Sequence, residues 1–287
     1  MKVTLTSGTD RVLLTQHPFQ LSQKVNLSGL SANIITSDAN TDGANFLRSN
    51  FQTRDVDLEG YIRVSGMKDS IIQKHRDTLY RVFNPKNKVI VEFEDENIYY
   101  QIEGYPVSFP VFESGFQNSN HSFQRFLLQL HCTDPFIYKA KKYIVFADVV
   151  PKFSFPLQFN SVVFGEKSTS GLIETVYNSG VMECPLEIKM KATNTVVNPS
   201  LLNVYSGEQI KFNTTLLPGE ELYINTGRKK EISKITGNIK EPFYYALDLS
   251  SEMMNLRVGD NVFRFAADEN EEYLLVEISY RERLGGI

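Results

Sequence analysis

The residues with the clearest potential for chemistry are Asp38, Asn40 and Asp42, which alternate along the chain and are followed by Gly43. Oxygen ligands at alternate positions, with a glycine that permits a sharp bend, form the first half of a calcium-binding loop. The position that should carry a bidentate glutamate is Ser49, and no helical pattern precedes Asp38. A polar surface turn explains the same residues, because Asp, Asn and Gly each favour turns. We therefore assign no metal site here.

The four histidines also lack the spacing of a metal site. His17, His75, His121 and His131 form no HxH or HxxxH pair, and none has a cysteine in a zinc pattern. His131 and Cys132 are neighbours in a predicted strand, so their side chains should point to opposite faces. His75 falls on the stripe of a predicted helix and should be half-buried.

The two cysteines, Cys132 and Cys184, fall in different predicted domains. They could form one disulfide at most, and a reducing compartment disfavours it. We expect both to be buried as small hydrophobic side chains.

No sequence pattern supports nucleophilic or cofactor chemistry. The Gly- and Ser-rich stretch Gly165–Gly171 lacks the spacing of G-x-S-x-G and is predicted to be a hairpin loop. There is no P-loop and no G-x-G-x-x-G, and the carboxylates show no pattern typical of glycosidases. The sequence therefore assigns no catalytic, cofactor-binding or metal-ligating residue, and a wall-degrading hydrolase is the least supported alternative.

Aromatic side chains raise the question of sugar binding. The chain has 20 Phe and 14 Tyr but no Trp. Tyr223, Tyr244 and Tyr245 could offer flat rings to a pyranose, although most aromatic residues fall at alternating core positions and should serve packing. A carbohydrate-binding module that recognises host cell-wall saccharide therefore stays open as the alternative function.

Composition and charge exclude other classes of function. With 287 residues the chain can form two domains with cores of their own, and a net charge of −4 gives no basic footprint for nucleic acid. The N-terminal sequence has no apolar region of a signal peptide, and no run approaches the ~18 apolar residues of a membrane-spanning helix. We expect a protein that is made in the cytoplasm and has no membrane partner.

In the first half of the chain, strand-like segments surround one helix. Apolar residues recur at helical spacing from about Lys68 to Phe83, and Asn84-Pro85 ends that helix because the residue before proline avoids helical geometry. The polar segment Ser37–Asn50 precedes it and is predicted to be an exposed loop or hairpin tip. A strand at Gln124–Cys132 closes this half.

The second half, from about Tyr143, alternates between apolar and polar residues, as half-buried strands do. Turn residues at Pro218-Gly219, Thr226-Gly227, Thr236-Gly237 and Gly259–Asn261 separate the alternating segments. The pattern predicts a β-sandwich or barrel. Its alternating sets are Leu186/Ile188/Met190, Ile210/Phe212, Leu222/Ile224, Leu247/Leu249, Phe263/Phe265 and Leu274/Val276/Ile278/Tyr280.

Together these segments predict a mainly β protein of two domains, residues 1–145 and 146–287. The first is β-rich with one helix, and the second is a β-sandwich. The chain ends its first half with Asp134-Pro135-Phe136, which is a plausible end of the first domain.

In order and spacing, these segments resemble the distal tail protein family of siphophages that infect Gram-positive bacteria. In the first half the resemblance rests on the order of strands, polar excursion, single helix and final strand, ending in Asp134-Pro135-Phe136. In the second half it rests on an ordered set of short motifs. These are Asn178-Ser179-Gly180 before Pro185, Leu186–Met190, Asn198–Leu201, Ser206–Glu208, Pro218–Glu221, Ile224–Thr226 and Leu256–Asn261.

The resemblance implies a structural, non-enzymatic protein of the phage tail tip or baseplate in the virion, made in the host cytoplasm. Such proteins form a ring, typically a homo-hexamer, which an extended arm closes by reaching the neighbouring subunit; Ser37–Asn50 is our candidate for part of that arm. The second domain would be galectin-like. Implied partners are the tail tube protein and the tail-associated lysin or hub protein, with receptor-binding proteins as further candidates and no sequence-specific binding of nucleic acid.

Overall fold

The computed structural model describes residues 1–65, 69–96, 98–146, 149–150, 166–167 and 173–287, which form two compact units. The first comprises Met1–Ala140 with Arg283–Ile287, and the second comprises Lys141–Glu282. The boundary lies after Ala140, whereas the sequence predicts it after residue 145. The reason is that β11 (Lys142–Phe146) pairs with β24 (Leu274–Tyr280) of the second unit. Most of the hairpin loop expected at Gly165–Gly171 lies outside the described residues.

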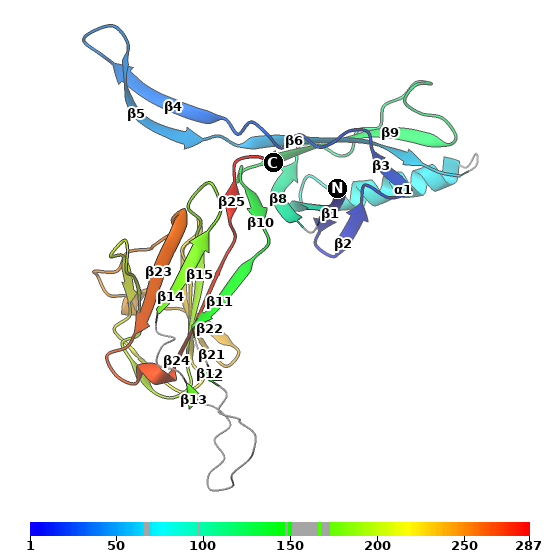
Figure 1. The fold of residues 1–287 in the computed structure, drawn as a ribbon. Helices are drawn as coiled ribbons and strands as arrows, with labels where there is room; N and C mark the ends of the chain where they lie inside the picture. Colours follow the sequence, from blue (N-terminus) through cyan, green and yellow to red (C-terminus); the bar gives the residue numbers. More distant parts are fainter. Residues whose placement is uncertain (66–68, 97, 147–148, 151–165, 168–172) are drawn as a thin grey trace, which may run out of the picture. The chain divides into compact units, whose positions relative to one another are not determined.

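The first unit is built on an antiparallel sheet in the order β2-β1-β7-β8-β9-β6-β3, with β10 beside β8 and β25 (Figure 1). Its hairpin β4–β5 forms a separate two-stranded sheet. The strands are β1 Lys2–Ser7, β2 Asp10–Leu13, β3 Phe19–Leu21, β4 Ala32–Asp38, β5 Ala44–Phe51, β6 Arg54–Arg63, β7 Val89–Asp95, β8 Ile98–Pro106, β9 Phe123–Cys132, β10 Ile137–Lys139 and β25 Arg283–Leu284.

Helix α1 (Asp69–Val82) packs against β1, β2 and β6. Its buried residues Ile72, Leu79 and Val82 lie at helical spacing, and the helix ends just before Asn84-Pro85, as the sequence predicts. The helix covers a core that includes the fully buried rings of Phe83, Phe93 and Phe126. No helix in the described part of the chain is long and apolar enough to cross a membrane.

The second unit contains a six-stranded sheet, β11-β24-β15-β20-β21-β22, and a four-stranded sheet, β14-β23-β17-β18. Two short pairs, β12–β13 and β16–β19, accompany them. Besides β11 and β24, the strands are β12 Val149–Val150, β13 Glu166–Lys167, β14 Ile173–Asn178, β15 Leu186–Ala192, β16 Val196–Val197, β17 Ser200–Asn203, β18 Gln209–Lys211, β19 Thr215–Leu216, β20 Glu221–Asn225, β21 Glu231–Thr236, β22 Ile239–Pro242 and β23 Gly259–Ala266.

The two larger sheets bury one shared core, so the second unit is a β-sandwich. Met190 and Ile278 come from the six-stranded sheet, Leu201 and Phe263 come from the four-stranded sheet, and all four have no exposed surface. The alternating apolar residues of the sequence thus face inward from both sheets. The expected class, mainly β in two domains with one α-helix, is confirmed over the described residues.

Two details of the predicted sandwich are wrong. Leu247 and Leu249 do not share a strand face: Leu249 is fully exposed, in a turn that follows a 3₁₀ helix at Tyr244–Ala246. The Asp248 carboxylate forms this turn by accepting hydrogen bonds from both the backbone N–H and the hydroxyl of Ser250. Gly259–Asn261 lies at the start of β23 and not between strands; Gly259 has a φ of +88° there.

Candidate interaction surface

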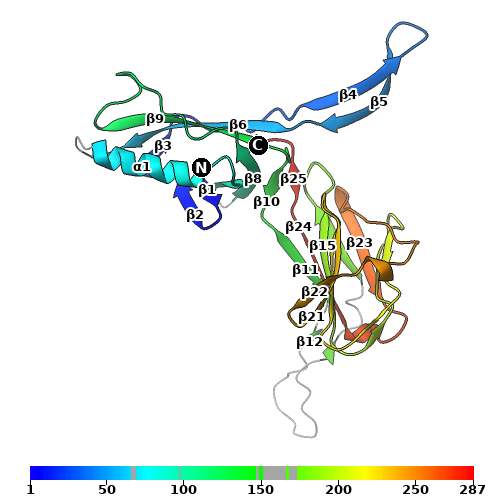
Figure 2. The same cartoon turned by 180° about the vertical axis from the view of Figure 1, so that it is seen from behind.

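The most distinctive surface of the first unit is the hairpin of β4 and β5, residues 32–51, which we call the arm hairpin. It extends away from the main sheet of its unit (Figures 1 and 2). Every residue of β5 is exposed, and no residue of β4 is buried. The polar segment Ser37–Asn50 is therefore the turn and second strand of a long hairpin, the second of the two forms that the sequence allows.

One face of the arm hairpin carries three large apolar side chains, Ile34, Phe46 and Phe51, beside Thr36 and Ser49. Ala32 pairs with Phe51, Ile34 with Ser49, and Thr36 with Phe46, after a register shift that leaves Leu47 as an extra residue. Since successive residues of a strand point to opposite faces, Ile34, Phe46 and Phe51 share one face. Phe46 is 65% exposed and Ile34 is 63% exposed.

The opposite face of the arm hairpin is mostly polar. It carries Asn33, Asn45, Arg48 and Asn50, besides Ile35. A two-stranded hairpin by itself is marginally stable in water, and contiguous exposed apolar residues usually mark an interaction site. The arm hairpin thus has one face that is suited to cover by another surface.

An aromatic contact and a buried arginine anchor the base of the arm hairpin. Phe51 packs edge-to-face on Phe136, with ring centroids 5.6 Å apart. Arg54, the first residue of β6, is 7% exposed and donates to the carbonyl oxygen of Leu27 at 2.9 Å and to that of Gly285. Its burial lowers the pKa of Arg54. No local sequence pattern indicates the role of Arg54, because its partners are distant in the chain.

The tip of the arm hairpin holds the residues of the half calcium pattern. Asp38 ends β4, Gly43 has a φ of +103°, and the side-chain amide of Asn45 donates to the carbonyl oxygen of Asp38 at 3.3 Å. Among the described residues, no three His, Cys, Asp or Glu side chains gather as metal ligands. Gly43 and the hydrogen bond from Asn45 shape the turn of the hairpin.

The histidines are dispersed over the first unit. His131 Nδ1 lies 2.6 Å from Asp55 and His121 Nδ1 lies 2.9 Å from Asp69, both across neighbouring segments. His75 is half-buried, as expected, with its ring edge-to-face on Phe19; burial and the nearby His17 and Lys74 lower its pKa.

Cys132 and Cys184 are both buried thiols, as expected. His131 and Cys132 point to opposite faces of β9, so Cys132 lies in the core while His131 remains partly exposed. Burial raises the pKa of the Cys132 thiol to about 12, which makes it a poor nucleophile at neutral pH.

The three tyrosines considered for sugar binding have separate partners. Tyr223, on β20, lies under the ammonium of Lys240 at 4.5 Å from the ring centre. Tyr244 donates its hydroxyl to the carbonyl oxygen of Lys230 at 2.8 Å. Tyr245 is 81% exposed and packs edge-to-face on Phe243. Tyr244 and Tyr245 are neighbours in the 3₁₀ helix Tyr244–Ala246.

Buried polar residues of the sequence motifs support turns. Asn178 donates to the carbonyl oxygens of Met182 and Leu256 at 3.0 and 3.1 Å. Asn261 accepts from the N–H of Arg257 and donates to its carbonyl oxygen. Glu220 accepts from the N–H of Leu217 at 2.9 Å. These side chains hold the backbone in its turns, which gives the motifs a structural role.

Comparisons with known proteins agree with this structural role. Residues 6–132 match the family model of a phage tail protein RIFT-related domain, and residues 179–284 match that of a siphovirus-type tail component, C-terminal domain. A search of curated proteins returns no match.

Solved structures share the fold over the whole chain. The Dit protein of phage SPP1, a paradigm of the hub adsorption apparatus in phages that infect Gram-positive bacteria, aligns with a TM-score of 0.68 and 14% identity over 98% of both chains. A chain of the activated phage p2 baseplate with strontium aligns with a TM-score of 0.56 and 9% identity, covering 100% of this chain and 99% of its own. The same baseplate with calcium gives 0.55 and 10% over the same shares.

Because their sequence identity to this chain is low, the solved structures show only that the fold is shared. The two family models match both halves of the chain in the expected order. The chain belongs to the distal tail protein family of siphophages and is a structural component of the phage tail.

Proposed function

We propose that this protein forms a closed homo-hexameric ring, which acts as the hub between the tail tube and the adsorption apparatus of a siphophage. The first unit forms the ring, and the second unit, a galectin-like sandwich, carries the contacts outward. The protein is made in the cytoplasm of the bacterial host and acts in the virion, without enzymatic activity of its own.

The observation that carries this proposal is the arm hairpin with its exposed apolar face. Ile34, Phe46 and Phe51 are each about half exposed or more, and burying each such side chain contributes about 1.5–3 kcal/mol. The arm hairpin extends from one part of its unit, and its apolar side chains would be covered by a different part of a second copy. This arrangement favours a head-to-tail contact between copies. Head-to-tail contacts generate rings when the rotation between copies closes.

The neighbours of the ring follow from the family. The tail tube protein lies on one side, and the tail-associated lysin or hub protein lies on the other, with receptor-binding proteins as further candidates. The solved relatives support this assignment, since they include a hub protein of an adsorption apparatus and chains of a baseplate.

The first test is the mass of the purified protein in solution, together with negative-stain images of the same sample. We expect particles of about six times 32.8 kDa, seen as rings with a central hole. Closed rings with another number of copies would show that the hexamer is wrong and that the ring proposal is right. A monomer both alone and with the tail tube and lysin proteins would overturn the ring.

The arm has a test of its own. Removing residues 38–49 takes away the turn and most of β5, so we expect ring formation to weaken while both units stay folded. Circular dichroism and thermal unfolding check the fold of the variant. Unchanged assembly would dismiss the arm assignment and leave the hub itself untouched.

A further inference from the structure

A pocket lies at the end of the first unit opposite to the arm hairpin. It has a volume of about 470 Å³ and is formed between the first turns of α1 and the loop before β9. The register of β6 and β9 fixes this separation: Arg54, beside the arm hairpin, pairs with Cys132, while Arg63 at the far end of β6 pairs with Phe123, next to the pocket. Both ribbon views show the arm hairpin and α1 at opposite ends of this unit (Figures 1 and 2).

The pocket offers a cation that has no acidic partner. Arg76 stacks over the ring of Phe112 at 4.5 Å, and its buried Nε has no hydrogen-bond partner among the described residues. No acidic group of the described chain forms an ion pair with Arg76. The carboxylate in the pocket, Asp69, already contacts His121 Nδ1 at 2.9 Å and 3.2 Å through its two oxygens. An acidic group that enters the pocket would therefore meet Arg76.

The side chains around Arg76 suit a polar polypeptide turn. Gln124 donates from its amide to the carbonyl oxygens of Glu113 and Arg125, which fixes its orientation at the pocket wall. Phe116 is 89% exposed and lines the same pocket. An exposed aromatic ring beside fixed polar groups is typical of a surface that a partner covers.

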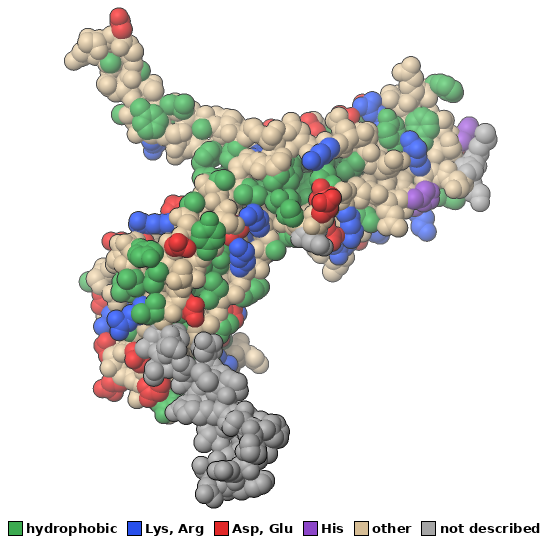
Figure 3. All heavy atoms as spheres, viewed as in Figure 1, with side chains coloured by type: hydrophobic (Ala, Val, Ile, Leu, Met, Phe, Trp, Pro, Cys, Tyr) green, Lys and Arg blue, Asp and Glu red, His purple; other side chains and the backbone are tan. Residues whose placement is uncertain are grey.

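The tip of the arm hairpin has the complementary chemistry. It carries Asp38, the last residue of β4, and Asp42 in the turn, both exposed, and no basic residue lies between Ser37 and Leu47. Its other residues are small, so the turn is narrow. Figure 3 shows an acidic side chain at the end of the arm hairpin, and basic and histidine side chains over the opposite end of the unit.

We propose that the acidic tip of the arm hairpin of one copy docks into the Arg76 pocket of the next copy around the ring. This inference rests on the proposed ring and names the acceptor of the arm. Because donor and acceptor lie at opposite ends of one unit, each copy can give its arm to one neighbour and receive the arm of the other. Like charges brought together across such a contact weaken it strongly, which makes the contact testable by charge reversal.

The test uses two variants of the full chain, one with Asp38→Lys and Asp42→Lys, and one with Arg76→Glu. Each alone places like charges at every contact, so we expect the concentration at half-assembly to rise at least about tenfold. Mixed in equal amounts they can alternate around an even-numbered ring, where each contact pairs opposite charges, and we expect assembly to return to near the wild-type concentration. The control Lys74→Glu changes charge by the same amount on α1 without lining the pocket.

A second measurement guards against misfolding of Arg76→Glu. Asp42→Cys and Gln73→Cys variants, oxidised as a mixture, should form a disulfide between copies, since both native cysteines are buried. If the wild type forms a ring, the charge variants assemble normally and the cysteine variants form no disulfide, the docking proposal is wrong while the ring proposal stands. A wild-type chain that never associates would overturn both. Assembly that is lost in the variants and not restored in the mixture, without the disulfide, would also overturn the docking.

Discussion

Arg54 donates from its guanidinium to the carbonyl oxygen of Gly285, 231 positions further along the chain. The same guanidinium donates to Leu27, which precedes the arm hairpin, while Arg54 itself follows it. One buried side chain thus joins both ends of the arm hairpin to the returning C-terminal segment. Gly286 lies close as well: a Cβ there would meet the carbonyl oxygen of Leu27 at 3.1 Å and the Cα of Ser28 at 3.3 Å.

Replacing Arg54 by methionine should destabilise the first unit by about 1–3 kcal/mol, because the carbonyl groups of Leu27 and Gly285 lose their donor. Urea unfolding measures the change, and assembly at low concentration should weaken with it. The control Arg48→Met removes an exposed guanidinium from the polar face of the arm hairpin and should leave stability within about 0.5 kcal/mol. Equal stability of the two variants would remove Arg54 from this anchoring role.

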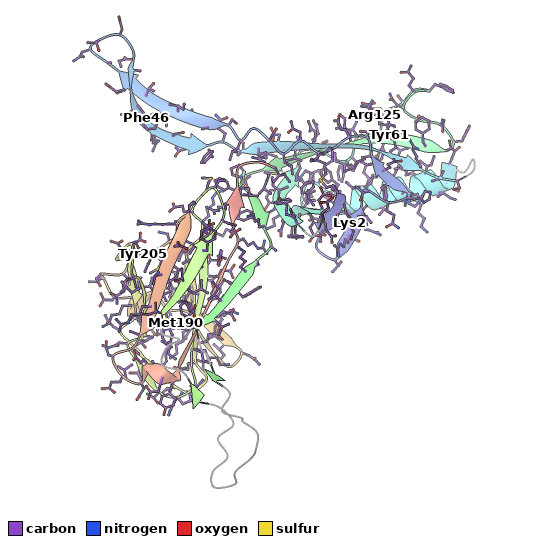
Figure 4. The ribbon with its side chains drawn as sticks, in the orientation of Figure 1. Lys2, Phe46, Tyr61, Arg125, Met190 and Tyr205 are labelled. Carbon is purple, nitrogen blue, oxygen red and sulfur yellow. The ribbon has the colours of Figure 1, made fainter. Side chains whose placement is uncertain are left out.

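Substituting Phe46 by serine should weaken ring formation without loss of folded stability. The ring of Phe46 is 65% exposed in one copy and is expected to be covered by a neighbour. Tyr205→Ser is the matched control, since Tyr205 is 70% exposed on the second unit, and Figure 4 marks both side chains. Analytical ultracentrifugation over a concentration series should show a rise of about tenfold or more in the half-assembly concentration for Phe46→Ser alone. The same rise in both variants would argue against a specific role of the arm face.

The sequence predicts the elements whose signals are local, namely a periodic pattern of apolar residues and a residue that ends the element. Helix α1 has an apolar stripe and ends before a proline. Strand β15 alternates between apolar and polar residues over its whole length, so its burial follows directly from the sequence. Leu247 and Leu249 show the limit of this reasoning. Two apolar residues two positions apart fit a strand, but the Asp248 side chain binds Ser250 and forms a turn instead.

The arm face and its anchor depend on contacts that no local pattern reveals. The apolar face combines Ile34 with Phe46 and Phe51 from the other strand, and the extra residue Leu47 interrupts the period of two. The polar composition of Ser37–Asn50 indicates exposure but not strand pairing. The polar anchors Arg54 and Glu282 use partners that only the tertiary fold brings together.

The turn at Asp248 predicts a dependence of stability on pH. Hydrogen bonds from Ser250 and Asn213 lower the pKa of Asp248 to about 2, from 3.8. A lowered folded-state pKa stabilises the fold above the ordinary pKa, and this contribution disappears as pH falls from about 4 through about 2. We expect Asp248→Asn to melt below the wild type at pH 6 and to converge with it near pH 2. A difference in melting temperature that stays constant over this range would show that the charge of Asp248 does not matter.

Gly104 allows two segments of the first unit to approach closely. A Cβ at this position would lie 2.6 Å from the carbonyl oxygen of His131 and 3.0 Å from Cys132 Sγ. Since β9 is fixed by β6 on its other side, Gly104→Ala should destabilise the unit by about 1–3 kcal/mol in chemical unfolding. The control Gly285→Ala meets nothing closer than Leu30 at 4.0 Å and should be nearly neutral. Equal effects at both glycines would mean that the strands can separate to accept the methyl group.

Glu282, the last residue of the second unit, should contribute far more to the free energy of unfolding than an exposed glutamate does. Its carboxylate has no exposed surface, accepts from the N–H and hydroxyl of Ser179 at 3.0 and 2.8 Å, and lies 2.5 Å from Lys142 Nζ. Removing it leaves these donors without their acceptor, so Glu282→Ala should destabilise the second unit by about 3 kcal/mol. Glu94→Ala breaks a comparable pair with Lys2, in which both side chains are more than half exposed, and should cost about 1 kcal/mol or less. Hydrogen exchange in β14 and β24 would locate the loss, and a small, equal effect of both substitutions would show that solvent reaches Glu282 in solution.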